Sequence, residues 1–354
     1  MITESAIIYS ILWLVSVKEV ILQIIVSGSN SIVAVSYHPH VKAIVKGIVI
    51  KSTGSWYSVM TDDLKVCNCR LKGQFRIKGI RTTNPVAVGD HVEFEWEGTQ
   101  ENGVIKKIEP RTNYIVRRSI NLSKTAHIIA SNIDRLYIVA SIMLPRTSTG
   151  FIDRLLVTAE AYHIPAALIF NKVDIYTAEA HERCSELMEL YSSLGYPSYA
   201  VSALEGTGLD ILRSVLCDKV NLFSGHSGVG KSALINALDP LLTIKTGEIS
   251  AYHNKGMHTT TFAEMHPLSF GGYMIDTPGI KEFGLVHFES QEISERFPEF
   301  RALLHNCRYN NCTHVHEPGC AVKKALDEGG INPERYHNYL GLLNDENLDI
   351  TDYV

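Results

Sequence analysis

The sequence predicts a multidomain protein with a small N-terminal β-barrel, a central α/β domain and a C-terminal, mainly α-helical metal-binding domain. Three observations predict this organisation. Short alternating runs separated by turn residues fill the chain from residue 43 to about 118, strands alternate with helices after residue 119, and three cysteines lie close together after residue 284. A chain of 354 residues is long enough for such domains.

The composition is typical of a globular protein, with 45% hydrophobic and 20% charged residues. The net charge of -5 does not by itself suggest a nucleic-acid partner, but residues 41–120 contain 14 Lys or Arg against 8 Asp or Glu. The seven cysteines do not have the spacing of a small secreted disulfide framework. They favour a reducing cytoplasm and one metal site.

Residues 1–41 are predicted to be an apolar extension outside the main fold. Their stretch "AIIYSILWLVSV" has 12 mostly apolar residues, which is too short to span a bilayer. A signal peptide would need a positively charged start, and Glu4 lies there instead. A packed or interfacial helix and membrane insertion remain alternatives, although we do not expect a membrane partner.

Residues 42–118 are predicted to form a closed five-stranded barrel. The runs "AIVKGIVIK", "WYSVMT", "VCNCRLKGQFR", "HVEFEWE" and "GVIKKIEP" alternate in polarity and are separated by Gly, Asp and Asn turns. An OB-fold is the leading candidate, and an SH3-like barrel would give a similar pattern.

The positive charge of this barrel favours RNA as a partner, because such barrels bind RNA with a basic groove and stacking aromatic rings. Arg111, Arg117 and Arg118 are candidates to neutralise RNA phosphates. The aromatic candidates are Trp56, Tyr57 and Phe75. The alternative is a solvated barrel face without a ligand.

Residues 119–284 are predicted to form an α/β domain with a parallel sheet. The strand candidates "RLYIVASI", "AALIFNK", "SYAVSAL" and "VNLFSG" alternate with the helix candidates "FIDRLLVTAEAYHI", "EAHERCSELMELYSSLG" and "GLDILRSVLC". Strands and helices in this order predict helices on both faces of the sheet. The boundary with the barrel is expected near residues 119–132.

The stretch "GHSGVGKS" matches the phosphate-binding pattern G-x4-G-K-[ST] between a strand and a helix. Its backbone N–H groups are expected to cradle phosphates, Lys231 to reach the outer phosphates, and the Ser232 hydroxyl to bind Mg²⁺. The backbone positions are Gly225, His226, Ser227, Gly228, Val229 and Gly230. A glycine-rich turn without a ligand is the alternative.

Two segments after this loop resemble the parts of a nucleotide switch. In "DTPG", Asp276 can hold Mg²⁺ through water, and the Gly279 N–H can meet the γ-phosphate. In the preceding loop-like stretch, one of Thr259, Thr260 and Thr261 is expected to bind Mg²⁺ and the γ-phosphate. We favour Thr260.

The stretches "FNKVD" and "VSAL" predict a guanine site. Asn171 can bond N7, the Lys172 stem can cover the base, and the Asp174 carboxylate can accept from adjacent N–H groups on the pairing edge. Ser202 precedes Ala203, whose N–H can meet O6. Both stretches follow predicted strands, and ligands of open parallel sheets bind at the carboxyl ends of strands.

The base-reading stretches precede the phosphate loop, whereas an ordinary guanine-nucleotide domain has the opposite order. If the two ends of an ordinary domain are joined and its chain is opened before the base-reading strand, the base-reading stretches come first and the phosphate loop follows, as they do here. The sequence therefore predicts a circularly permuted GTPase domain.

The catalytic candidates are His258, Lys231 and Thr260. Ile280 follows "DTPG" where Ras-like switches carry a glutamine that orients water, and its side chain cannot form hydrogen bonds. Unaided hydrolysis should therefore be slow, with a partner completing the site. His258 could position the water, or it could be a surface histidine without a role.

Residues 285–354 are predicted to form a zinc-binding helical domain with an acidic tail from Asn344. Cys307, Cys312, His314 and Cys320 offer three thiolates and one imidazole within 14 residues, which suits one structural Zn²⁺. His316 is an alternative fourth ligand. Buried cysteines without a metal are the other alternative.

These motifs in this order resemble the RsgA/YjeQ family of circularly permuted GTPases that depend on the small ribosomal subunit. The resemblance covers about residues 42–344 and rests on "NKVD", "VSAL", "GHSGVGKSALINAL", "MHTTT", "DTPGIKEFGL" and "CRYNNCTHVHEPGCAVKKAL". The segment before His40 departs from the family pattern.

The resemblance implies an OB-fold, a permuted GTPase and a zinc domain that bind the small subunit and its 16S rRNA during late maturation. It implies GTP and Mg²⁺ at the positions above, zinc at Cys307, Cys312, His314 and Cys320, and His258 as the catalytic histidine. We expect a cytoplasmic monomer whose GTP turnover is stimulated by the subunit. GTP hydrolysis is expected to release the protein from the subunit. A GTP-gated scaffold at a membrane is the competing hypothesis.

Overall fold

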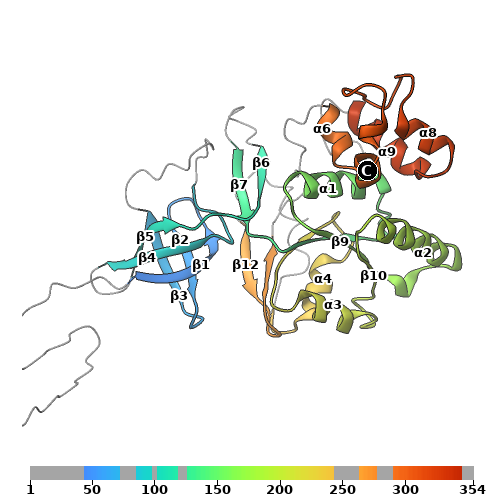
Figure 1. Ribbon diagram of the computed structural model, residues 1–354. Coiled ribbons are helices and arrows are strands. Elements are labelled where there is room, and N and C mark those ends of the chain that lie inside the picture. Colours follow the sequence, from blue (N-terminus) through green and yellow to red (C-terminus); the bar gives the residue numbers. More distant parts are fainter. Residues whose placement is uncertain are drawn as a thin grey trace, which may run out of the picture. The chain divides into compact units, whose positions relative to one another are not determined.

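The computed structural model describes residues 44–71, 85–97, 102–118, 126–242, 263–276 and 290–344 (Figure 1). The predicted N-terminal extension and the residues of the acidic tail after Asn344 lie outside these ranges. Among the described residues, no helix is both long and apolar enough to cross a membrane.

The first five strands form the predicted barrel. Their pairing order is β1-β2-β3-β5-β4, β3 and β5 are parallel, and β4 pairs with β1 to close the sheet. This is the order of an OB-fold, so the OB-fold prediction is confirmed over the SH3-like alternative. The strands are β1 (Ile44–Ser52), β2 (Tyr57–Thr61), β3 (Val66–Leu71), β4 (His91–Glu97) and β5 (Asn102–Ile108).

Alternation along the strands directs one set of side chains into the barrel, as the sequence pattern predicted. Val49, Val59, Cys69 and Phe94 are fully buried there. Tyr57 also belongs to this core, with its hydroxyl donating to the Gly54 carbonyl. Tyr57 therefore does not present a ring for stacking on the barrel surface, whereas Trp56 is exposed. Phe75 lies outside the described residues.

Arg111 is an internal structural residue. Its Nε and Nη2 donate to the two carboxylate oxygens of Asp90, both at 2.6 Å, and Nη2 also donates to the Pro85 carbonyl. The Arg111 side chain is 8% exposed and Asp90 is fully buried. We therefore do not retain Arg111 as an RNA-binding candidate, because its guanidinium is committed to this contact.

An antiparallel hairpin, which the sequence analysis did not predict, follows the barrel. It joins β6 (Tyr114–Arg118) to β7 (Ala126–Ser131). Its Ile115 and Ala130 share a core with barrel residues and with the central sheet. Arg117 and Arg118 lie in β6, but their side chains are outside the described part.

The central sheet has the order β10-β9-β8-β11-β13-β12, in which β12 is antiparallel and the other five strands are parallel. The strands are β8 (Arg135–Ala140), β9 (Ala166–Phe170), β10 (Ser198–Ala200), β11 (Val220–Ser224), β12 (Glu264–Pro267) and β13 (Tyr273–Asp276). The helices are α1 (Thr149–Ala161), α2 (Ala178–Ser193), α3 (Leu209–Leu216) and α4 (Lys231–Leu238).

Helices cover both faces of this sheet, as predicted. Alternate strand residues such as Ile138 and Leu168 pack with α1 and α2, while Val139 and Ile169 pack with α3 and α4. Figure 1 shows α1 on the opposite side of the sheet from α3 and α4. The carboxyl ends of the parallel strands are thereby left for loops, which is where such sheets bind ligands.

The C-terminal helices pack on α1. They are α6 (Ser290–Glu295), α7 (Pro298–Arg301), α8 (Ala321–Asp327) and α9 (Pro333–Asn344). Val157 of α1 belongs to the same core as Phe297, Phe300 and Tyr339. Since α1 also packs on the sheet, residues 152–159 are all buried.

A buried ionic network crosses this contact. The Asp153 carboxylate of α1 accepts from Arg335 Nη1 at 2.5 Å, Asn338 Nδ2 at 2.6 Å and the Tyr191 hydroxyl at 2.8 Å. Arg335 also donates to both carboxylate oxygens of Glu299. Burial raises the pKa of Asp153, and the three donors oppose this shift. The carboxylate is thus stabilised by partners from α2 and α9.

We expect Arg335→Ala to lower the free energy of unfolding by about 3–5 kcal/mol, because the buried Asp153 would lose its cation. Urea unfolding followed by circular dichroism measures this loss. Arg301→Ala is the matched control, since Arg301 pairs with Glu160 of α1 but is 50% exposed. It should cost about 0–1 kcal/mol. If both variants lost the same free energy of unfolding, the buried network would contribute no more than an exposed ion pair, which would contradict this prediction.

Candidate functional site

The phosphate-loop motif lies between β11 and α4, at the carboxyl edge of the sheet. Gly230 precedes α4 in a left-handed conformation with φ 91°, and a Cβ there would lie 2.5 Å from Asn171 Nδ2. A Cβ on Gly225 would lie 2.2 Å from the Val139 carbonyl oxygen. The loop therefore needs glycine at both ends, because its backbone packs directly on neighbouring strand ends.

Lys231 lies over its own loop. Its Nζ donates to the carbonyls of Gly225 at 2.6 Å and His226 at 2.7 Å. Burial lowers the pKa of Lys231 to about 8, and the Asp276 carboxylate opposes this shift. Burial raises the pKa of Asp276, which His266 and Lys231 oppose. Strands β11 and β13 are parallel neighbours, so these oppositely charged residues belong to one edge of the sheet.

Asn171, directly after β9, connects three loops. Its Nδ2 donates to the Val229 carbonyl of the phosphate loop at 2.9 Å, and its Oδ1 accepts from the Ala203 N–H at 3.1 Å. These partners are 58 and 32 residues away along the chain. The structure thus brings the "FNKVD", "VSAL" and "GHSGVGKS" stretches together, as a circularly permuted GTPase domain requires.

The other base-reading candidates lie in the same place. The Ser202 hydroxyl donates to Asp174 Oδ1 at 2.5 Å and accepts from the Glu205 N–H at 3.0 Å. Lys172 Nζ donates to the Leu144 carbonyl at 2.5 Å. Asp174 is therefore oriented by the loop after β10, and Lys172 by the loop after β8.

The loop 141–148 after β8 is a part of this site that the sequence analysis missed. Besides the Leu144 contact, Pro145 lies 3.5 Å from the position a Cβ on Gly228 would occupy. The sequence signal that could have identified loop 141–148 is its position directly after a parallel strand, because ligands bind at the edge of the sheet where such strands end. No phosphate or base motif marks it.

The phosphate loop also contacts α1. The His226 ring stacks on the Phe151 ring with centroids 3.7 Å apart. Beside this pair is a cavity of about 80 Å³ that His337 and Asn338 of α9 also line. Helix α1 therefore contacts both the phosphate loop and the C-terminal helices.

Several predicted site residues lie outside the described ranges. These are His258, Gly279, Ile280 and the threonines Thr259, Thr260 and Thr261. Among the remaining candidates, Ser227 is exposed and Ser232 is half-buried at the start of α4.

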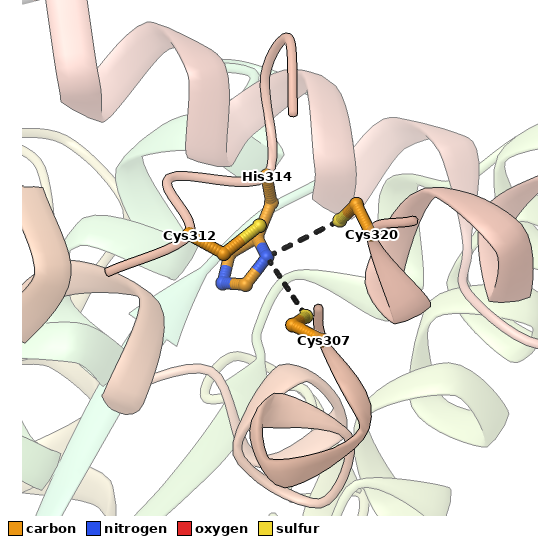
Figure 2. Close-up of side chains that lie close together, drawn as sticks. All are labelled: Cys307, Cys312, His314 and Cys320. Carbon is orange, nitrogen blue, oxygen red and sulfur yellow. Dashed lines mark hydrogen bonds between the residues drawn. The ribbon is translucent and has the colours of Figure 1, made fainter. Parts of the chain in front are cut away.

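The C-terminal cluster contains Cys307, Cys312, His314 and Cys320, whose candidate ligand atoms all lie within 4.8 Å of one another (Figure 2). His314 Nδ1 lies 3.4 Å from Cys320 Sγ and 3.7 Å from Cys307 Sγ. Zinc bonds of about 2.3 Å to sulfur and 2.0 Å to nitrogen fit donors at these separations. The donor set is therefore compatible with a tetrahedral zinc site.

The alternative ligand His316 is exposed, whereas His314 is 1% exposed and points its Nδ1 at the sulfurs. Cys320 caps α8, where its Sγ accepts from the Lys323 N–H at 3.4 Å. The Tyr336 hydroxyl donates to the His314 carbonyl, and the Tyr339 hydroxyl donates to the Thr313 carbonyl. Helix α9 thus holds the loop that carries His314.

Comparison with known proteins matches most of this chain. The family model described as RsgA GTPase matches residues 108–286, and that of the RsgA N-terminal domain matches residues 46–105. A relative from Bacteroides fragilis, named small ribosomal subunit biogenesis GTPase RsgA, is 55% identical over 85% of this chain and 97% of its own length. A Bacteroides thetaiotaomicron relative, RsgA 2, is 54% identical with the same coverage.

Two solved structures are similar in fold. YjeQ from Thermotoga maritima has a TM-score of 0.70 and 31% identity, covering 86% of this chain and 98% of its own. YloQ, described as a circularly permuted GTPase, has a TM-score of 0.67 and 29% identity, covering 88% of this chain and 97% of its own.

We expect about one zinc ion per purified chain, because the four donors fit this metal. Metal analysis by mass spectrometry should find none after Cys307 and Cys312 are both replaced by serine. Cys217→Ser is the control and should keep the metal, since Cys217 belongs to the loop before β11 and donates to the Phe270 carbonyl. Full zinc content in the double variant would show that these thiols do not bind it.

Proposed function

Because this chain belongs to the RsgA GTPase family and is a GTP hydrolase, we propose that it acts in the late maturation of the small ribosomal subunit. It binds the subunit and its 16S rRNA with GTP, the subunit stimulates hydrolysis to GDP and phosphate, and hydrolysis releases the protein. A factor of this kind works in the cytoplasm, where we expect it as a monomer. Two relatives more than 50% identical to this chain are named as small ribosomal subunit biogenesis GTPases, which supports this role.

One observation carries the nucleotide part of the proposal. The Asn171 amide is bonded both to the phosphate loop, at Val229, and to the loop after β10, at Ala203. A guanine nucleotide carries its base at one end and its phosphates at the other. One molecule can therefore occupy both parts of the site only if the base-reading loops and the phosphate loop are neighbours. In this proposal Asn171 bonds N7, the Lys172 stem covers the base, Asp174 accepts from the pairing edge, and the Ala203 N–H meets O6. Ser202 orients Asp174.

At the phosphate end, the backbone from Gly225 to Gly230 cradles the phosphates, and Lys231 carries positive charge to the outer ones. Among the described residues, the Lys231 ammonium donates to the backbone carbonyls of Gly225 and His226, which a phosphate can replace as its acceptor. Ser232 and Asp276 would hold Mg²⁺, Asp276 through water. The metal would neutralise charge on the transferring phosphate.

We assign the remaining steps to residues outside the described ranges. Thr260 completes the Mg²⁺ site, the Gly279 N–H senses the γ-phosphate, and His258 positions the water. Ile280 supplies no side-chain hydrogen bond. The ribosomal subunit therefore completes the catalytic arrangement in this proposal.

The barrel and the zinc domain supply the subunit contacts. Arg117 and Arg118 remain the candidates for RNA phosphates, and Trp56 offers an exposed ring for stacking. Cys307, Cys312, His314 and Cys320 hold one structural zinc, which fixes the loop between α7 and α8. We propose domain limits of 42–118, 119–284 and 285–354, with residues 1–41 as an extension.

We expect purified small ribosomal subunits to raise the GTPase rate of the full chain by about tenfold or more, because the subunit completes the site. Phosphate release with and without subunits measures this. Lys231→Ala should show no stimulated rate. An unchanged rate with small subunits, together with sedimentation on lipid vesicles, would favour the membrane scaffold instead.

Asp174→Asn should weaken GTP binding by about 10- to 100-fold and strengthen binding of xanthosine triphosphate, whose altered edge suits an amide. Calorimetric titration with both nucleotides measures the change in preference. The control is Asp210→Asn on α3, because Asp210 is exposed and pairs with Arg213 of the same helix. An unaltered preference would remove Asp174 from the base site.

A further inference from the structure

The hydroxyl of Tyr176 is an unusual feature of the base-reading segment. Tyr176 follows the short 3-10 helix Val173–Ile175 and is 8% exposed. Its hydroxyl donates to the Asn171 carbonyl at 2.8 Å, accepts from the Ile142 N–H at 2.9 Å, and lies 3.4 Å from Ser141 Oγ. One side chain thus joins the loop after β9 to the loop after β8.

The Asn171 contact sets the orientation of the residue that connects the other loops. The Asn171 N–H donates to the Ala140 carbonyl, and its own carbonyl accepts from Tyr176, so both backbone groups are held. The side chain then reaches Val229 and Ala203. A displacement of the Asn171 backbone would move both of these contacts.

The hydrogen bond from the Ile142 N–H to the Tyr176 hydroxyl holds the segment 141–147. The Thr147 N–H donates to the Ser141 carbonyl at 2.8 Å, and the Ser141 N–H donates to Thr147 Oγ1 at 3.1 Å, which closes the segment into a compact turn. Within this turn Leu144 has φ 44°, the residue is 70% exposed, and its carbonyl accepts from Lys172. The turn therefore lies against the residue whose stem is proposed to cover the base.

A buried tyrosine hydroxyl needs only one partner to offset its burial. This hydroxyl has two close partners and a third nearby, and all of them belong to segments that border the proposed base site. Burial raises the pKa of Tyr176, so the hydroxyl remains protonated and able to donate at neutral pH. Simple satisfaction of a core polar group does not require this placement.

We propose that Tyr176 is a positioning residue for guanine recognition, which acts by holding Asn171 and the segment 141–147 in the arrangement that accepts the base. This inference rests on the base site proposed above. Segment 141–147 then forms a further wall of that site, with Leu144 beside the Lys172 stem. We expect replacement of Tyr176 to change nucleotide affinity more than the chemical step, because its hydroxyl bonds the loops after β9 and β8, which border the proposed base site.

Tyr176→Phe in the full chain tests this inference. We expect the Kd for GDP and the KM for GTP to rise about tenfold, with kcat within about twofold of the wild type, because the hydroxyl's two hydrogen bonds are lost. Tyr196→Phe is the matched control. Tyr196 is also buried, but its hydroxyl bonds Glu160 at the far end of α1, so GDP affinity should not change.

Thr147→Val provides a second variant, since it removes the hydrogen bond from the Ser141 N–H to Thr147 Oγ1 without altering Tyr176. It should also weaken GDP binding, by about threefold or more. If both variants bind GDP like the Tyr196→Phe control, or if Tyr176→Phe lowers kcat and leaves KM unchanged, the inference is wrong. A wild-type chain that binds no guanine nucleotide would instead refute the proposed function.

Discussion

The Asn171 side chain makes the contacts on which the arrangement of the proposed nucleotide site depends. It is 1% exposed and makes one hydrogen bond to each of two loops that are distant in sequence. If this buried amide lost both partners, the folded protein would be destabilised by about 1–3 kcal/mol. The closeness of Gly230, where even a Cβ would clash with Asn171 Nδ2, shows how little room the contact leaves. The loop after β9 and the loop between β11 and α4 therefore stay together, whichever of them comes first in the chain.

The permutation is tolerated because the parallel sheet, and not the chain order, determines which loops meet. Strands β9, β8 and β11 are neighbours in the sheet, so the loops after them share one edge. Cutting and rejoining the chain elsewhere preserves these neighbours. The same constraint explains the position of segment 141–147. Because β8 lies between β9 and β11, the loop after β8 must lie between the loops that follow those two strands.

The sequence was sufficient for features that depend on local backbone or on short periodic patterns. The glycines of "GHSGVGKS" and the alternating barrel strands are of this kind, and both have the predicted form. Features that depend on long-range polar pairing were not predictable. Asp153 lies within an apolar helical run, and its partner Arg335 is 182 residues away. Arg111 was predicted to be a candidate for RNA phosphates, because nothing in the sequence identifies Asp90 as its buried partner. Tyr176 carries no motif at all.

Helix α1 connects the zinc-compatible cluster to the nucleotide site through contacts that differ in kind. Towards the phosphate loop it offers the Phe151 ring, which stacks on His226. Towards α9 it offers Asp153, whose carboxylate is held by Arg335 and Asn338. Separating a buried charge pair is far more costly than sliding two stacked rings. Of the two contacts, the one with α9 is therefore the firmer, and α1 is tied more strongly to the C-terminal helices than to the loop before α4.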